Sequence, residues 1–271
     1  MRPRALVGLV LMTMVILLGT NGAANAGAQA GPVGKPRGTP TAQSFHGIPT
    51  VGVLFPPGSL VHTCTASVID SHTGNLLITA GHCISGTGKG YIFAPGYHDG
   101  IEPFGSWVVV GAYGAPGWIA DQSPQRDFAF LAVAPRQVNG RIEQIQSVTG
   151  ANQLGIAPAS GERVKVPAYA TGRDDDPLTC INRVDYHGRF PAFACNPYPG
   201  GTSGAPWLHR TGHGWTVVGI IGGLHQGGCY PWISYSPAFG AVTARTRADA
   251  EVSADASRFP SPSGDGCSAA P

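Results

Sequence analysis

Residues 77–83 read LITAGHC, an apolar run that passes into small residues and then places an imidazole beside a cysteine. The β-rich letters up to Thr79 predict a buried strand, and His82 follows at the mouth of that strand. A single histidine among the nine of this chain is more often structural than catalytic. His82 therefore gains a functional meaning only if other segments supply the partners that a catalytic imidazole needs.

Two other segments contain the residue types that such an imidazole would use. Residues 126–133 read RDFAFLAV, which puts Asp127 at the mouth of a second apolar strand. Residues 200–207 read GGTSGAPW, in which Ser203 stands among glycines that free backbone N–H groups and leave the hydroxyl uncrowded. Alone, Asp127 could cap a turn and the glycine-rich segment could be a flexible turn. Together with His82, they supply the nucleophile, base and acid of serine acyl transfer.

The order of these residues and the motifs around them indicate a particular group of serine hydrolases. The order His82, Asp127, Ser203 belongs to the chymotrypsin family, and the lack of a GxSxG motif argues against an α/β-hydrolase. Residues 79–83, TAGHC, look like the TAAHC motif of that family. Residues 193–206 resemble the serine segment of bacterial glutamyl endopeptidases, where GxSGSP is usual. The chain thus resembles a secreted bacterial chymotrypsin-like (trypsin-like) serine protease, nearest the glutamyl endopeptidase branch.

This resemblance covers residues 45–250 and implies an all-β fold of two packed six-stranded antiparallel β-barrels, with the active site in the cleft between them. His82 and Asp127 would come from the first barrel and Ser203 from the second. Ser203 would attack the scissile carbonyl while His82 takes its proton and Asp127 orients His82. The oxyanion would lie against the backbone N–H groups of Gly201 and Ser203. The implied activity is that of a serine endopeptidase acting on protein or peptide substrates, without a metal or organic cofactor.

The chain departs from the family around the serine. Thr202 stands where chymotrypsin-type zymogens have an aspartate that pairs with the freed N-terminus, so activation by that salt bridge is not available. Tyr198 replaces a threonine of the glutamyl branch. Ile221 stands about where that branch has the histidine that grips the substrate carboxylate, and His225 follows four residues later. The resemblance therefore does not transfer glutamate specificity.

The residues expected to form the substrate pocket are Tyr198, Ile221, Gly222, Gly223 and His225. Tyr198 and Ile221 would make the walls largely apolar, and the glycines would leave room for a bulky side chain. A pocket for lysine or arginine needs an acid at its base, and the six residues before Ser203 contain none. We expect uncharged, medium-to-large residues at P1, the position on the acyl side of the cleaved bond. Acidic P1 through His225 is the first alternative, and basic P1 is the second.

The composition of the 271-residue chain excludes several other classes of protein. Its 17 Lys and Arg against 15 Asp and Glu give a net charge of +2, which is not the strongly basic balance of a nucleic-acid binder. With 12% charged and 42% hydrophobic residues, it is unlike a disordered chain. Short β-rich runs such as 50–55, 163–168 and 215–221 predict an all-β sandwich or barrel. A weak helical pattern occurs near residues 243–254, and we expect a monomer.

The two ends of the chain differ from the part between them. Residues 1–26 have a basic start, an apolar run and Ala24-Asn25-Ala26, which together predict a secretory signal peptide. A retained anchor is the alternative, but the run is too short for a comfortable membrane span. Residues 27–44 are expected to be a pro-segment or flexible arm, 45–150 the first barrel, 151–250 the second barrel and 251–271 a tail. We therefore expect an extracellular protein with no membrane contact after signal removal.

Six cysteines in an exported chain indicate disulfides rather than thiols or structural zinc. The sequence allows 15 pairings, and the resemblance implies Cys64–Cys83. For the others we prefer Cys180–Cys195 with Cys229–Cys267, and a Cys195–Cys229 pair is the alternative. Residues 174–176, three aspartates, could bind calcium, but they lack a recognisable ligand spacing and an exposed acidic loop is favoured.

Two rival functions remain open at this level. A catalytically silent, secreted binding protein could use the same fold, because fold does not imply function. The presence of His82, Asp127 and Ser203 together argues against that reading. Acyl transfer to a non-peptide ester is the other rival, and the motifs do not exclude it.

Overall fold

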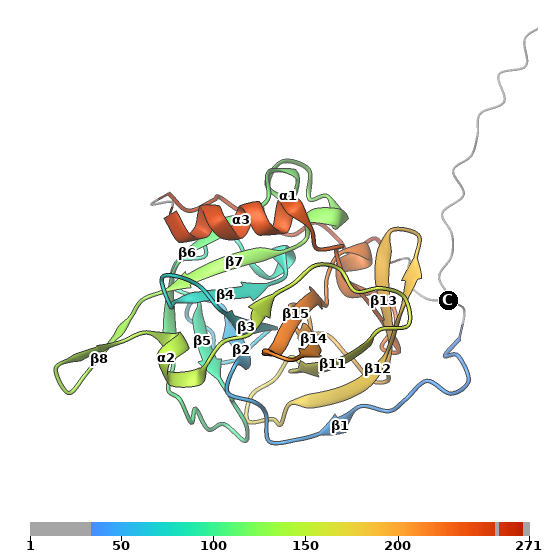
Figure 1. Cartoon of the computed structure of the whole chain (residues 1–271), viewed down its shortest axis with the longest axis horizontal. Coiled ribbons are helices and arrows are strands. Elements are labelled where there is room, and N and C mark those ends of the chain that lie inside the picture. The colour runs from blue at the N-terminus through green and yellow to red at the C-terminus, as the bar shows by residue number, and fades with distance from the viewer. Residues whose placement is uncertain (1–33, 253–254, 268–271) are drawn as a thin grey trace, which may run out of the picture. The chain divides into compact units, whose positions relative to one another are not determined.

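The computed structural model describes residues 34–252 and 255–267 of the chain. The chain divides into two units, Met1–Lys35 and Pro36–Pro271, and the elements below belong to the second unit. The expected signal peptide, residues 1–26, lies outside the described residues. Figure 1 shows that strands dominate this unit. Among the described residues, no helix is both long enough and apolar enough to span a bilayer.

The first half of the unit is a closed antiparallel barrel with the strand order β2-β3-β4-β7-β6-β5. Its strands are β2 (Val51–Phe55), β3 (Cys64–Ile69), β4 (Leu76–Thr79), β5 (Ile92–Pro95), β6 (Trp107–Gly114) and β7 (Ala129–Val133). Along β6, Trp107 and Val109 are buried while Val108 and Val110 are exposed, because successive side chains of a strand point to opposite faces. The barrel confirms the expected mostly β architecture for this half.

The second half is an eight-stranded sheet whose main path is β10-β15-β14-β11-β12-β13-β16, with β1 paired to β12. Its strands are β1 (Gln43–Ser44), β10 (Gln153–Leu154), β11 (Arg163–Ala168), β12 (Leu178–His187), β13 (Phe190–Ala194), β14 (Pro206–Thr211), β15 (Gly214–Ile220) and β16 (Ile233–Tyr235). The strand pairing leaves this sheet open, whereas a second closed barrel was expected. Just beyond β15, Gly222 N donates to Tyr235 O of β16 at 2.9 Å. The irregular chain after Gly222 does not extend that bond into a ladder.

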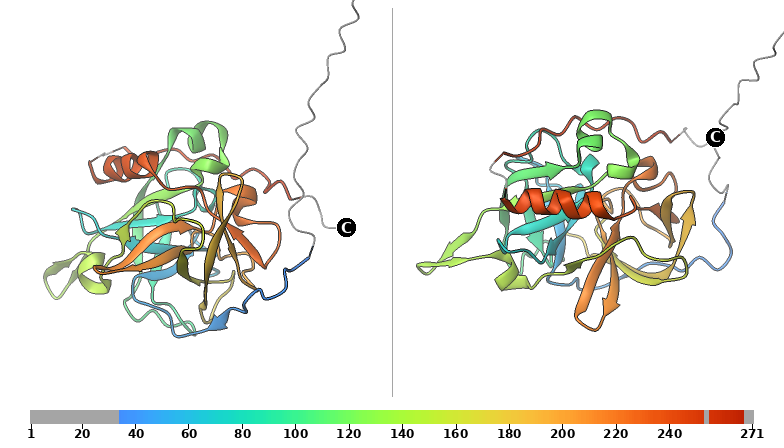
Figure 2. Two further views of the ribbon diagram at one scale, coloured as in Figure 1. Left: turned by 45° about the vertical axis from the view of Figure 1, so that its right-hand side comes forward. Right: turned by 45° about the horizontal axis from the view of Figure 1, so that its top comes forward.

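Short helices and one hairpin connect these strands. They are η1 (Gly81–Cys83), α1 (Pro116–Asp121), η2 (Pro124–Arg126), the hairpin strands β8 (Arg136–Val138) and β9 (Arg141–Glu143), α2 (Ile145–Thr149) and η3 (Leu224–Gly227). The longest helix, α3 (Ala241–Val252), follows the second sheet in sequence but packs against β6 and β7 of the first barrel (Figure 2). The weak helical pattern near residues 243–254 therefore marked a real element.

The segment after α3 returns from the first barrel to the second sheet. Phe259 exchanges two backbone hydrogen bonds with Gly86 of the first barrel. Further on, Cys267 forms a disulfide with Cys229 of the second half. The other two disulfides are Cys64–Cys83 and Cys180–Cys195, so all three preferred pairings are present.

Candidate active site

His82 and Asp127 meet at one end of the first barrel. His82 lies in η1, directly after β4, and Asp127 lies between η2 and β7. Because β4 and β7 are antiparallel neighbours with Thr79 opposite Ala129, these two turns lie side by side. His82 Nδ1 is 2.8 Å from Asp127 Oδ2.

Asp127 is fully buried, and three N–H groups satisfy its carboxylate. Its Oδ1 accepts a hydrogen bond from His82 N at 2.9 Å. Its Oδ2 accepts from the His82 ring and, at 2.7 Å, from the backbone N of Gly223 in the second half. A buried carboxylate without such donors would be very costly. Only 9% of the His82 side chain is exposed, so the pair is held in one orientation.

Gly222 and Gly223 have a different place from the one expected. Both are buried, and neither lines the cavity beside Ser203. A Cβ at Gly222 would lie 3.1 Å from Asp127 O, and a Cβ at Gly223 would lie 2.9 Å from Pro237 N. These glycines therefore let the chain approach the buried carboxylate closely, rather than leave room for a substrate side chain.

The segment around Ser203 depends on glycines with positive φ. Gly201 has φ +93° and Gly204 has φ +81°, and a Cβ at either position would overlap neighbouring backbone atoms. Within the described residues, the backbone N–H groups of Gly201 and Ser203 donate to no protein acceptor. They are the two groups that the resemblance assigns to the oxyanion hole.

His82 and Ser203 line one cavity of about 540 Å³. Of the expected pocket residues, Tyr198, Ile221 and His225 also line it. The Tyr198 hydroxyl donates to Val166 O, and burial raises the pKa of this phenol above its ordinary value. Tyr198 is therefore a neutral donor with an apolar ring. In the described structure, no hydrogen bond joins the side chains of His82 and Ser203.

The C-terminal segment contributes residues that the sequence did not point to. Pro262 and Asp265 line the same cavity as Ser203, and Asp265 is its single carboxylate among the described residues. His225 Nδ1 donates to Asp265 O at 3.1 Å, and Gln226 Nε2 donates to Ser263 O at 2.6 Å. His225 and Gln226 have φ of 53° and 52°, a conformation that non-glycine residues rarely adopt without support. No local motif in the tail signals these contacts, because they join residues that lie about 40 positions apart.

Several of the residues considered for metal binding have other partners. In the described part of the chain, the one cluster with suitable spacing is His225, Cys229 and Cys267. Its two sulfurs are joined in a disulfide, so they are not thiolate ligands. In the acidic triplet, Asp175 pairs with the buried His62, whose Nε2 lies 2.7 Å from its Oδ1.

Comparison with known proteins gives similarity at the level of structure. No protein-family model matches the chain, and no curated protein matches it. The protease Anisep from Arthrobacter nicotinovorans has a TM-score of 0.67 and 23% identity, covering 79% of this chain and 100% of its own. The thermostable serine protease AL20 from an extremophilic microorganism has a TM-score of 0.63 and 21% identity, covering 75% of this chain and 97% of its own. A Glu endopeptidase solved in complex with MPD has a TM-score of 0.63 and 17% identity, covering 80% of this chain and 99% of its own.

Identities this low show the fold alone. All three structures span most of this chain and nearly the whole of their own, so the likeness includes both halves. It implies the two-barrel chymotrypsin fold, with the second barrel open in its strand pairing here. The chain is thus structurally similar to bacterial chymotrypsin-like serine proteases, including a Glu endopeptidase.

Proposed function

We propose that this protein is a secreted serine endopeptidase in which Ser203, His82 and Asp127 form the catalytic triad. The observation that carries the proposal is the buried His82–Asp127 pair, which opens onto the same cavity as Ser203. Asp127 Oδ2 accepts a hydrogen bond from Nδ1 of His82, so in the neutral imidazole the other nitrogen, Nε2, carries no proton. That nitrogen is the one that must take the hydroxyl proton of the nucleophile.

The reaction follows from this arrangement. Ser203 Oγ attacks the scissile carbonyl carbon as His82 Nε2 takes its proton, and the carbonyl oxygen becomes an oxyanion. The N–H groups of Gly201 and Ser203 are free to donate to that oxyanion. His82 then gives its proton to the leaving amine, and an acyl-enzyme remains on Ser203. Water then attacks the acyl carbon as His82 takes a proton from it. The bond from that carbon to Ser203 Oγ breaks, the carboxylic acid leaves, and His82 returns the proton to Oγ.

For substrate preference, we propose uncharged, medium-to-large residues at P1. Tyr198, Ile221 and Ile233 contribute apolar surface to the cavity, and no Lys or Arg of the described residues lines it; a preference for Arg or Lys would instead point to Asp265, its carboxylate, as the counter-ion. His225 is the one nearby imidazole besides His82, and its Nδ1 is engaged by Asp265 O. A peptide series that differs only at P1 tests this preference. A preference for Glu that is lost in His225→Ala would overturn it in favour of the glutamyl alternative.

A fluorophosphonate probe tests the catalytic proposal directly. We expect stoichiometric labelling of the protein at Ser203 and no labelling of Ser203→Ala. A protein that folds but does not label would be the binding module instead. If the protein labels, digestion of a peptide library by the unlabelled enzyme then separates an endopeptidase from an esterase. An esterase would hydrolyse esters but leave peptides intact.

The extracellular location is part of this proposal. Three disulfides are consistent with an oxidising compartment. We propose residues 1–26 as the signal peptide and a mature N-terminus between Gly27 and Phe45. Residues 41–44 contact the second sheet through β1 and through the bond from Ala42 N to Asn196 O. Mass analysis of the secreted protein gives the position of the cut.

A further inference from the structure

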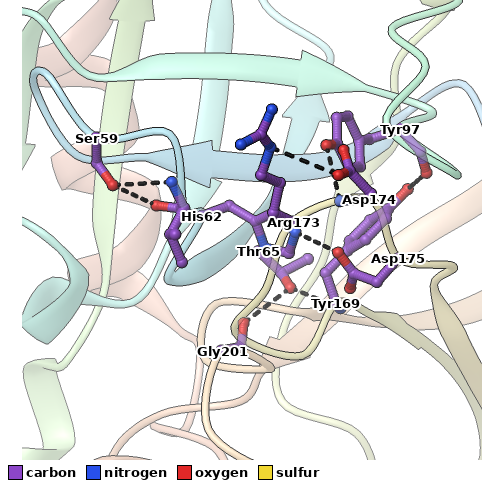
Figure 3. Close-up of polar contacts among 10 residues, drawn as sticks. Ser59, His62, Thr65, Tyr97, Tyr169, Arg173, Asp174, Asp175 and Gly201 are labelled. Atoms are coloured by element: carbon purple, nitrogen blue, oxygen red, sulfur yellow. Dashed lines mark hydrogen bonds and ion pairs between the residues drawn. The ribbon is translucent and has the colours of Figure 1, made fainter.

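Thr65 is the second residue of β3, and it lies between the first barrel and the segment around Ser203 (Figure 3). Its side chain is fully buried. We propose that Thr65 is a positioning residue for the oxyanion hole, acting through the carbonyl groups of Gly201 and Ser203. This inference rests on the proposed hydrolase activity.

Thr65 makes two hydrogen bonds to the serine segment. Its backbone N donates to Ser203 O at 2.8 Å, and its hydroxyl donates to Gly201 O at 3.2 Å. The hydroxyl also accepts a hydrogen bond from Tyr169 N at 3.0 Å. Because a carbonyl can only accept and an N–H can only donate, these partners fix the direction of the hydroxyl proton. The hydroxyl of Thr65 is therefore committed to Gly201 O.

These bonds complete a set that holds four successive peptide groups. Gly200 O accepts from Thr171 N at 2.7 Å, and Thr202 O accepts from Ala205 N at 3.0 Å. The C=O and N–H of one peptide are coplanar and point in opposite directions. The bonds to Gly200 O and Thr202 O thus aim the N–H groups of residues 201 and 203, which are the oxyanion donors. The peptide between them is held at its N–H by Pro199 O, to which Thr202 N donates at 3.3 Å, and at its carbonyl by the Thr65 hydroxyl.

Thr65 anchors that intervening peptide from outside the serine loop. Gly201 has φ +93°, a region open to glycine, and glycine rotates about its backbone more freely than other residues. Rotation of the 201–202 peptide would carry both neighbouring N–H groups away from a common point. Among the described residues, the Thr65 hydroxyl is the single side-chain group that anchors a carbonyl of residues 200–203. It restricts the motion that the glycine would otherwise allow.

Thr65 itself is held from both halves. Thr79 Oγ1 donates to Thr65 O at 2.8 Å within the barrel. Three residues earlier, His62 exchanges two backbone hydrogen bonds with Gly172, and its ring pairs with Asp175 (Figure 3). The bond to Thr65 O and the bonds of His62 leave the Thr65 hydroxyl little freedom to follow a displaced loop. This is the property required of a group that keeps donors in place before the substrate arrives.

The test compares Thr65→Val, which removes the hydroxyl at nearly constant shape, with Thr65→Ser, which keeps it. Removing an oxyanion donor outright costs about 100- to 1,000-fold in kcat, and loosening the donors should cost less. We expect kcat of Thr65→Val to fall roughly 10- to 100-fold, with KM changed less than about threefold. Thr65→Ser should stay within about threefold of the parent in kcat.

A second readout separates positioning from general damage. The affinity for a peptide aldehyde, which forms an oxyanion on Ser203, should weaken in step with kcat. The affinity for the matching peptide alcohol should stay unchanged. Thr246→Val is the matched control, because it removes a buried hydroxyl in α3, bonded to Val242 O, that does not line the cavity. It should leave kcat unchanged.

The outcomes are distinct. If the parent protein does not react with the fluorophosphonate, the proposed function is wrong. If the parent reacts and Thr65→Val keeps its kcat within twofold, or if Thr65→Ser falls as far as Thr65→Val, the positioning role is overturned and the function stands. Thr65→Ala leaves space for water at Tyr169 N and Gly201 O, so it serves as the test variant if Thr65→Val does not fold.

Discussion

Asp127→Asn changes one oxygen of a buried side chain into an NH₂ group, at a position where three N–H groups need acceptors. Asp127 Oδ1 serves His82 N, and Oδ2 serves both the His82 ring and Gly223 N. The asparagine can present its oxygen on one side only, so one buried backbone N–H is left unpaired in either orientation. The cost is about 1–3 kcal/mol of stability.

The two orientations of the asparagine differ in their effect on His82. With the NH₂ group toward the ring, the amide donates to Nδ1 and forces the ring proton onto Nε2, which then cannot accept the proton of Ser203. In a protease of this kind, the wrong tautomer lowers kcat about 10,000-fold. With the oxygen toward the ring, the tautomer is kept and only the negative charge is lost. We therefore expect a fall in kcat of about 1,000- to 10,000-fold.

The assay combines kcat on a chromogenic peptide with the free energy of unfolding from denaturant titration. Asp127→Ala should destabilise more than Asp127→Asn, because it orphans both His82 N and Gly223 N, at about 1–3 kcal/mol each. Asp185→Asn, on an exposed position of β12, is the control and should change neither quantity. If Asp127→Asn keeps kcat within tenfold of the parent, then Asp127 does not orient the base and the proposed triad is wrong.

Three further outcomes are expected. Ser203→Ala and His82→Ala should each remove nearly all hydrolysis, and the double variant should cost little more, because the residues act as a unit; additive losses in kcat/KM would contradict a triad. Burial lowers the pKa of His62 below its ordinary value near 6.5. As the pH falls, the unfolded chain therefore takes up this proton before the folded chain does. The free energy of unfolding should fall as the pH drops below about 6.5, by at most about 1.4 kcal/mol per pH unit for this group. Denaturant titrations at pH 7 and pH 5 check this, and the parent and His62→Gln should differ in slope. Replacing both Cys229 and Cys267 by serine frees the tail beside the cavity. KM should then change for peptides with several residues on the acyl side of the cleaved bond but not for single-residue substrates. Equal changes in KM for both kinds of substrate would show that the tail does not contact the substrate.

Local sequence predicted the strands whose residues are mostly apolar. β11 was expected at residues 163–168 and lies at Arg163–Ala168, and β2 was expected within one residue of its bounds. β12 gave no such signal, although it has ten residues, because only Cys180 and Val184 are buried and its other side chains are half-buried or exposed. Its pairing partners, rather than its own letters, make it a strand.

The candidate site divides in the same way. The segments around His82, Asp127 and Ser203 carry their residue types in short motifs, so these three could be named as candidates from the sequence. The surroundings of Asp127 could not, because Gly223 reaches the carboxylate from 96 positions away. The same glycines that suggested an open pocket are used for that close approach. The proposed role of Thr65 could not be predicted from the sequence, since it depends on a loop 136 positions later.

The hydrogen bonds that join the two halves are also the bonds that shape the site. Asp127 of the first barrel accepts from Gly223 of the second half, and Thr65 of the first barrel donates to Gly201 and Ser203. Separating the halves would therefore remove the Gly223 donor from the Asp127 carboxylate and release the segment that carries Ser203 at the same time. Since a hydrogen bond to a charged group stabilises by about 1.5–3 kcal/mol, the bond from Gly223 N to Asp127 helps to keep the halves together. The carboxylate proposed to orient His82 thus also favours the arrangement in which His82 and Ser203 share one cavity.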